Sequence, residues 1–257
     1  MNAQQLWVAF STIVRKEIRR FVRIWVQTLI PPVITIGLYF VIFGNLIGQR
    51  IGQMNGFDYM SFVVPGLIMM AVINNAYTNV VSSFYSAKFN KSIEELQVSP
   101  TPSWVILLGY VMGGMLRGLA VGIIVTTIAA LFTDVAVAHF AITLLVALLT
   151  ALLFALAGLI NAIFANSFDD ISIVPTFVLT PLTYLGGVFY SIDMLPEFWQ
   201  GVSQLNPILY VVNAFRYGFL GQSDVHIGVA LSGIAVITAL LFGIAWYLLE
   251  TGRRVRS

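Results

Sequence analysis

Residues 139–165 read HFAITLLVALLTALLFALAGLINAIFA and contain no Asp, Glu, Lys or Arg. A helix needs about 20 apolar residues to cross the hydrocarbon core of a bilayer, so this stretch is long enough to span it. Similar apolar stretches predict helical spans at roughly 26–47, 60–84, 104–132, 172–190 and 227–249. The sequence therefore predicts an all-α polytopic membrane protein with six transmembrane helices.

The composition of the whole chain agrees with this prediction. Of its 257 residues, 59% are hydrophobic and 9% are charged, whereas soluble domains carry about 25% charged residues. Transmembrane β-barrels alternate polar and apolar residues in segments of about ten, unlike these continuous runs. With no cysteine and two histidines, we expect this chain to bind no metal or other cofactor. A net charge of +2 is too small to indicate a nucleic-acid partner.

The basic residues predict the orientation of the spans. Ten of the thirteen Lys and Arg residues fall on one face of the predicted bundle: Arg15, Lys16, Arg19, Arg20, Arg23, Lys88, Lys91, Arg253, Arg254 and Arg256. Cytoplasmic loops of membrane proteins carry an excess of Lys and Arg. Both termini are therefore predicted to be cytoplasmic.

Residues 1–25 have the pattern of an amphipathic helix. Apolar residues recur at three- and four-residue spacing, and five basic side chains occupy roughly the opposite face. Such a helix lies in the plane of the membrane interface and is attracted to anionic lipid. Two interpretations remain open, a basic anchor that only sets topology and a surface element that a cytoplasmic partner also contacts.

The loop between the second and third spans contains a short helix at 91–99. Ser92 and Glu95 have the spacing of a capping box, and Ser99-Pro100 ends the helix. A loop that only turned the chain would not need a helix, so this one could serve as a handle for another protein. The alternative is a small helix that rests on the bilayer surface.

The fifth predicted span is interrupted. Pro175, Pro181 and the pair Gly186-Gly187 break its backbone hydrogen bonding, which a membrane tolerates only where protein or a wet cavity satisfies the backbone.

Two short helices are predicted in the segment 191–226 that follows. The first carries Glu197 and Trp199, and the second starts at the N-cap Asn206 and carries Arg216. Each is too short to cross the bilayer, so we expect an external re-entrant hairpin that dips into the outer leaflet. Glu197 and Arg216 are expected to form an ion pair.

Polar side chains also lie within the predicted spans. The second span has a stripe at helical spacing: Asn74, Asn75, Thr78, Asn79, Ser82, Ser83 and Ser86. The stripe could pack against other helices or line a transport path. In the third span Arg117 needs acceptors, which could be helix-end carbonyls, Asp169, Asp170 or an asparagine. Arg117 could form a structural ion pair there, or it could contact a substrate in the path. Tyr184 is one of several aromatic residues that could contact a substrate.

In their order and spacing these features resemble the membrane subunits of type-2 ATP-binding-cassette (ABC) exporters over essentially the whole chain. The resemblance implies a single transmembrane domain over 1–257, with an interface helix at 1–25, spans one to five at 26–190, re-entrant helices at 191–226 and the last span and tail at 227–257. It also implies a bacterial inner-membrane location. In that family the short cytoplasmic helix docks on a separate ATPase subunit, a role that falls here on Ser92, Glu94, Glu95, Leu96 and Pro100.

The expected partners are two ATPase subunits, a second copy of this chain and membrane lipid, with ATP and magnesium held by the ATPase. The sequence supports this division independently, because no lysine follows glycine as a phosphate-binding loop requires. Together with the missing loop, the resemblance implies a non-catalytic permease that exports an amphipathic or lipid-linked molecule or a drug. A secondary transporter or channel is the alternative, although no carboxylate lies well inside a predicted span.

Overall fold

The computed structural model describes residues 1–134 and 136–252, and among these the side chains of residues 44–46 and 49 are left out of the description. The basic residues Arg253, Arg254 and Arg256 lie outside the described residues.

Within this part of the chain, five helices are long and apolar enough to cross a membrane. They are Trp25–Phe43, which joins helix α2 (Trp25–Tyr39) to the start of η1 (Phe40–Ile47), and the helices α4 (Tyr59–Phe89), α6 (Ser103–Ala129), α7 (Phe140–Phe164) and α12 (Ile227–Thr251). They confirm five of the six predicted spans, with ends that differ by a few residues.

The predicted span at 172–190 is wrong in its length. Three short pieces form one helical run, α8 (Asp170–Val174), the π-helical η2 (Pro175–Leu179) and α9 (Thr180–Tyr184). At 1.5 Å per residue the run rises only about 22 Å, less than the roughly 30 Å of a hydrocarbon core. The physical reason is that proline removes backbone donors at two positions, and that the chain then turns at Gly187, whose φ is +73°.

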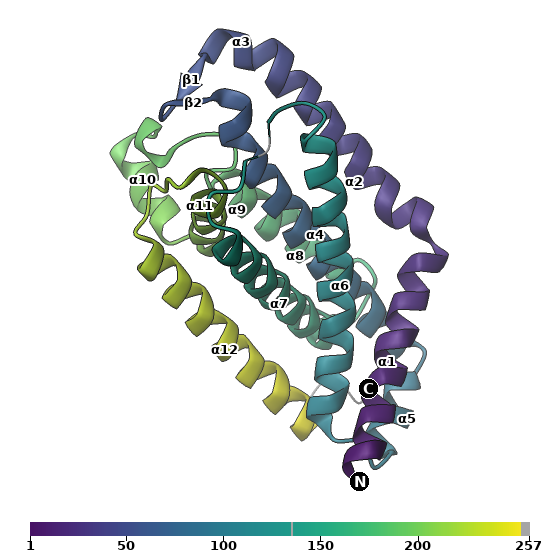
Figure 1. The fold of residues 1–257 in the computed structure, drawn as a ribbon. Helices are drawn as coiled ribbons and strands as arrows, with labels where there is room; N and C mark the ends of the chain where they lie inside the picture. The colour runs from purple at the N-terminus through teal and green to yellow at the C-terminus, as the bar shows by residue number, and fades with distance from the viewer. Residues whose placement is uncertain (135, 253–257) are drawn as a thin grey trace.

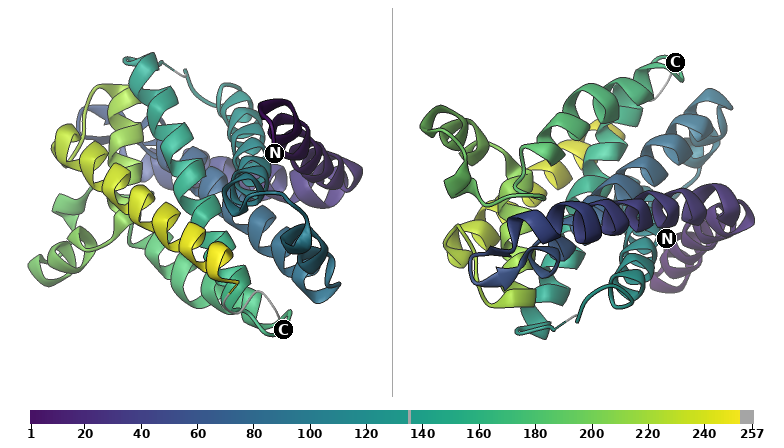
Figure 2. Two further views of the ribbon diagram at one scale, coloured as in Figure 1. Left: turned by 90° about the horizontal axis from the view of Figure 1, so that it is seen from below. Right: turned by 90° about the horizontal axis from the view of Figure 1, so that it is seen from above.

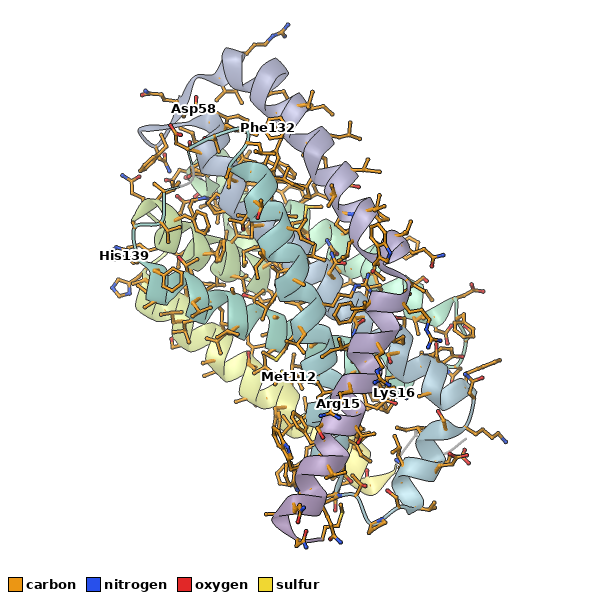
Figure 3. All side chains as sticks on the ribbon, turned by 45° about the vertical axis from the view of Figure 1, so that its right-hand side comes forward. Arg15, Lys16, Asp58, Met112, Phe132 and His139 are labelled. Atoms are coloured by element: carbon orange, nitrogen blue, oxygen red, sulfur yellow. The ribbon has the colours of Figure 1, made fainter. Side chains whose placement is uncertain are left out.

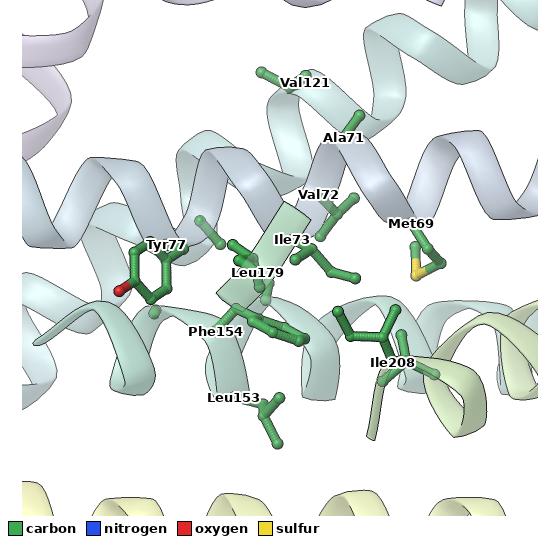
Figure 4. Packing of buried hydrophobic residues seen from close by; sticks show 14 of the residues in the cluster. Met69, Ala71, Val72, Ile73, Tyr77, Val121, Leu153, Phe154, Leu179 and Ile208 are labelled. Atoms are coloured by element: carbon green, nitrogen blue, oxygen red, sulfur yellow. The ribbon is translucent and has the colours of Figure 1, made fainter. Parts of the chain in front are cut away.

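Helix α4 lies at the centre of the bundle, between α6 and α7. It is mostly buried, and its close neighbours meet it through glycines. A Cβ added to Gly118 of α6 would lie 2.9 Å from Ala76 Cβ, and one added to Gly158 of α7 would lie 2.6 Å from the Tyr77 carbonyl oxygen. Figure 4 shows the packed side chains between these helices, including Ile73 and Phe154. Small residues therefore let the helices approach closely, as is common in membranes.

Helix α1 (Ala3–Arg23) packs on α6, and the chain bends at Ile24 before α2 runs along the edge of the bundle (Figure 1). The start of α1, the short helix α5 (Ser92–Val98) and the end of α12 lie at one end of the molecule, which we call the α5 end.

The opposite end, which we call the outer end, holds the remaining elements. These are α3 (Gly48–Ile51), the strands β1 (Gln53–Met54) and β2 (Phe57–Asp58), η3 (Ile192–Met194), α10 (Glu197–Gln204) and α11 (Pro207–Leu220). The two strands pair antiparallel around Asn55-Gly56, both at positive φ, as an Asn-Gly hairpin turn requires. The sequence analysis did not predict this hairpin.

The two short helices predicted before the last span are present, but they differ in their surroundings. Helix α10 stands out from the bundle (Figure 2), whereas α11 packs against α4, α7 and α12. Helix α11 is therefore part of the protein core at the outer end, and α10 is the peripheral member of the pair.

Candidate functional site

Helix α5 forms as predicted, but the prediction of a capping box between Ser92 and Glu95 is wrong. Lys91 precedes the helix in a left-handed conformation, with φ of 59°. Ser92 therefore occupies the first helical position, and its hydroxyl donates to the carbonyl oxygen of Ala87 at 3.2 Å. The reason is that α5 follows α4 so closely that the end of α4 supplies the partner for Ser92.

The side chains of α5 divide between the bundle and the surface. Ile93 is fully buried in the hydrophobic core and Leu96 is half-buried against it, so these two apolar side chains pack within the chain itself. Val98 is 84% exposed, and Glu95 is exposed beside it on the helix. The free surface of α5 is thus formed by Glu95, the partly exposed Glu94 and Val98.

The end of the α5 loop lies next to helix α1. A groove of about 480 Å³ is lined by Pro100 and by the first turns of α1: Met1, Gln4, Gln5, Val8 and Ala9. The loop that follows α5 and the first turns of α1 therefore line one groove at the α5 end.

The basic face of α1 is only partly as predicted. Arg15, Arg19 and Arg23 are exposed. Lys16 is also exposed, although its ammonium donates to the Tyr110 hydroxyl of α6 at 3.3 Å, and Arg20 reaches α4. Figure 3 shows Arg15 and Lys16 on α1, far from Asp58 and His139 at the outer end.

The sequence analysis missed Glu17, which is fully buried on the bundle face of α1. Its carboxylate accepts a hydrogen bond from the Ser83 hydroxyl of α4 at 2.6 Å. Its other oxygen lies 3.5 Å from Nε of Arg20. The signal was available, because Glu17 stands four residues after Ile13 and four before Phe21 on the apolar face of the predicted helix.

The polar stripe of α4 separates into two rows. One row, which we call the buried row, contains Asn75, Asn79 and Ser83, each less than 10% exposed. The other row, which we call the open row, contains Asn74, Thr78, Ser82 and Ser86, which are partly or fully exposed. The two interpretations of the stripe therefore apply to different sides of the same helix.

Each asparagine of the buried row binds an arginine from another helix. Arg117 of α6 donates to the Asn75 amide oxygen at 3.3 Å. One turn further on, Arg20 of α1 donates to both the carbonyl and the amide oxygen of Asn79 at 2.8 Å. Of the acceptors considered for Arg117, the structure thus selects an asparagine. The buried row ties three helices together.

Asp170 has a local role in the turn between α7 and α8. Its carboxylate accepts hydrogen bonds from the Asn166 backbone N–H at 2.8 Å and from the Ser167 hydroxyl at 2.8 Å. These bonds hold the pKa of Asp170 below its usual value. They fix the turn that leads into α8.

At the outer end, the predicted ion pair between Glu197 and Arg216 is wrong. Glu197 is exposed on α10, whereas Arg216 is buried in α11. Arg216 donates to the Gly187 carbonyl at 2.6 Å, and its Nη1 lies 3.8 Å from Oδ2 of Asp224. Its guanidinium carbon also lies 3.8 Å from the centre of the Phe62 ring. The reason is that α11 packs into the bundle while α10 projects from it. Asp224 is a partner that the sequence analysis missed.

Three other predicted residues lie near this end. Asn206 caps α11 by accepting from the Ile208 N–H at 2.9 Å, and its amide donates to the Leu182 carbonyl at 2.6 Å. The Tyr184 hydroxyl oxygen lies 3.4 Å from that of Tyr39 of α2. Trp199 packs edge-on against its neighbour Phe198. Asn206 thus fixes α11 against the end of the broken helix, and Tyr184 joins that helix to α2.

Comparison with known proteins finds relatives of this chain over most of its length. Residues 8–220 match the ABC-2 type transporter family. The chain is 60% identical over 251 residues to the inner membrane transport permease YadH of Escherichia coli (strain K12), with 98% of each chain covered. It is 22% identical over 218 residues to nodulation protein J of Rhizobium meliloti (strain 1021), with 83% of this chain and 82% of the relative covered. The family match extends from α1 to the end of α11 and includes both rows of α4.

Proposed function

This chain belongs to the ABC-2 type transporter family, and we propose that two copies of it form the translocation path of an ATP-driven exporter. It is a multi-pass protein of the inner membrane and a non-catalytic permease subunit. Membership of the family implies association with ATPase subunits. Beyond what membership of the family implies, we propose a homodimer, the direction of transport, the surfaces that contact the ATPase and the substrate, and the class of substrate.

The α5 end is the surface that we propose for the ATPase. Support comes from Val98, which is 84% exposed although it is apolar, and from the groove between Pro100 and α1. Glu94 and Glu95 add negative charge beside this apolar group, so a basic partner surface would be favoured electrostatically. Ser92 and Leu96 hold α5 on the bundle rather than touching the ATPase, because Ser92 donates to Ala87 of α4 and Leu96 packs against the hydrophobic core.

The open row of α4 is the surface that we propose for the path. Helix α4 is buried along most of its length, and its partly exposed positions recur every four residues at Asn74, Thr78, Ser82 and Ser86. An exposed polar row within a membrane helix needs water or protein opposite it. A path between two copies of the chain would supply both.

The polar character of this row, together with the apolar exterior of the chain, favours an amphipathic substrate. The row offers hydroxyl and amide groups without a formal charge, whereas Ile34 of α2 and Phe177 of η2 expose apolar side chains to lipid or to a second copy. A molecule with a polar part and an apolar part would match both surfaces. A lipid-linked molecule or an amphipathic drug has this character.

The observation that carries the proposal is the exposed α5 surface on a chain of this family. The test is to purify the chain with its ATPase subunit and to replace Val98 with aspartate. Val98→Asp should remove most of the co-purified ATPase. The matched control is Leu205→Asp, which changes an apolar residue that is 86% exposed between α10 and α11 and should leave the complex intact. An intact complex and ATP-driven transport in Val98→Asp would overturn the proposal.

A further inference from the structure

Helix α1 is seated on the bundle in a fixed register. A Cβ added to Gly113 of α6 would lie 2.5 Å from Glu17 Cβ, and one added to Gly109 would lie 2.6 Å from Ile13 Cγ2. Real Cβ atoms do not approach so closely, so Ile13 and Glu17 can pack here only because Gly109 and Gly113 have no side chains. These two contacts are one turn apart on both helices, so α1 cannot slide along α6 without losing both of them.

A buried carboxylate would be energetically unfavourable here if the contact between α1 and the bundle only held the helices together. Removing a charged group from water costs several kcal/mol, and well-packed apolar residues often serve adhesion equally well. Glu17 is nevertheless fully buried, with the Ser83 hydroxyl at 2.6 Å and Arg20 at 3.5 Å. Buried ionic groups of this kind are best known for fixing a particular arrangement of helices.

Arg20 extends this arrangement to α4. Its Nη2 donates to the carbonyl oxygen and to the amide oxygen of Asn79, both at 2.8 Å. Its Nη1 lies 3.4 Å from the Ser82 hydroxyl oxygen. Asn79 belongs to the buried row and Ser82 to the open row, so one guanidinium contacts both sides of the polar stripe. The planar fork of arginine suits such contacts better than the point charge of lysine.

We propose that Glu17 and Arg20 are positioning residues that couple α1 to α4, so that a displacement of α1 by the ATPase moves the open row of the path. Glu17 holds Arg20 from α1, and Arg20 holds α4. This inference rests on the proposed function, because it needs an ATPase at the α5 end and a path at the open row.

A cysteine at position 78 can report the movement, because the chain contains no cysteine and Thr78 is exposed in the open row. The Thr78→Cys chain is purified with its ATPase in lipid nanodiscs. Its labelling rate with a water-soluble maleimide is then measured with and without a non-hydrolysable ATP analogue and magnesium. We expect the nucleotide to change this rate by roughly fivefold or more, as for a typical coupling between sites.

In this background Arg20→Gln should abolish the nucleotide-dependent change in rate, whereas ATP hydrolysis and co-purification persist because α5 and the first turns of α1, which line the groove, are untouched. A purely structural role would lower the yield of the complex instead. The matched control is Arg19→Gln, which removes the same charge from an exposed position on the same helix and should keep the full change. Arg20→Lys keeps the positive charge but removes the planar guanidinium, so this variant should lose most of the nucleotide-dependent change in labelling rate.

Asn79→Ala provides a second variant if Arg20→Gln does not assemble. It removes one of the acceptors on α4 and leaves the pair of Glu17 and Arg20 in place, and it should reduce the nucleotide-dependent change. A full change in either Arg20→Gln or Asn79→Ala would overturn the link. If the Thr78→Cys parent bound no ATPase, the proposed function itself would fail, and this outcome is separate from a failure of the link.

Discussion

Arg216 lies at the outer end of the molecule with 1% of its surface exposed, and its guanidinium joins three segments. It contacts Gly187 after the broken helix, Phe62 in α4 and Asp224 before α12. Asp224 also accepts from the Ile192 N–H at 3.2 Å. The segments that close the outer end therefore depend on one side chain.

We predict that Arg216→Gln strongly destabilises the protein. The shorter side chain leaves Asp224 and the Gly187 carbonyl without their buried partner, and breaking a buried ion pair costs about 3 to 5 kcal/mol. The measurement is the midpoint of thermal unfolding in detergent, followed by tryptophan fluorescence. The control is Glu197→Gln, which changes an exposed residue of α10 and should shift stability by no more than about 0.5 kcal/mol. Equal midpoints for the two variants would contradict this account of Arg216.

At the scale of the element, the broken helix from α8 to α9 shows how an interruption is tolerated in the membrane. Pro175 has no N–H, so it cannot donate to the Ile171 carbonyl four residues earlier, as an α-helical residue would. The Asn161 amide of α7 lies 3.4 Å from that carbonyl oxygen and donates to it. A neighbouring helix thus satisfies the backbone group that proline leaves free.

This geometry predicts a coupling between Asn161 and Pro175. Asn161→Leu removes the donor and should destabilise the protein by about 1 to 3 kcal/mol, the usual cost of an unsatisfied buried polar group. Pro175→Ala restores an N–H within the helix and should offset part of that loss when the two changes are combined. A double-mutant cycle on thermal unfolding measures the offset. Strictly additive effects would show that Asn161 does not act through the Ile171 carbonyl.

The same helix shows what the sequence could predict about the fold. Membrane spans follow from local composition, because each must be apolar over the thickness of the bilayer, and five of them were predicted at nearly the right positions. The prolines indicated the interruption of the other span. They did not indicate that it would end at Tyr184, because that depends on the turn at Gly187, where an added Cβ would lie 3.4 Å from Leu209 Cδ1 of α11.

The candidate site could be predicted only in outline. Sequence pattern indicated that Arg117 and Arg216 need partners, but it could not choose Asn75 or Asp224, since pairs distant in the chain depend on how helices pack. Glu17 was missed because the basic residues around it suggested a wholly solvent-facing polar side. An acidic residue at an apolar position of the helix was the available signal.

At the scale of the whole molecule, the two ends differ in a way that bears on orientation. The α5 end holds the start of α1, and the exposed Arg15, Arg19 and Arg23 lie along the second half of that helix, whereas the outer end holds the small hairpin and the projecting helix α10 (Figures 1 and 2). An excess of basic residues marks the cytoplasmic side of a membrane protein. We therefore infer that the α5 end, where α1 begins and α12 ends, faces the cytoplasm.

This orientation predicts opposite labelling of two single cysteines in a chain that has none of its own. Val98 and Leu205 are 84% and 86% exposed, so either substitution should leave packing unchanged. In intact spheroplasts a membrane-impermeant maleimide should label Leu205→Cys, and it should label Val98→Cys only after lysis. The cysteine-free parent controls for background. The reverse pattern would place α5 and α1 outside, where no ATP-hydrolysing partner could reach them, and would refute the orientation and the coupling role of α5 together.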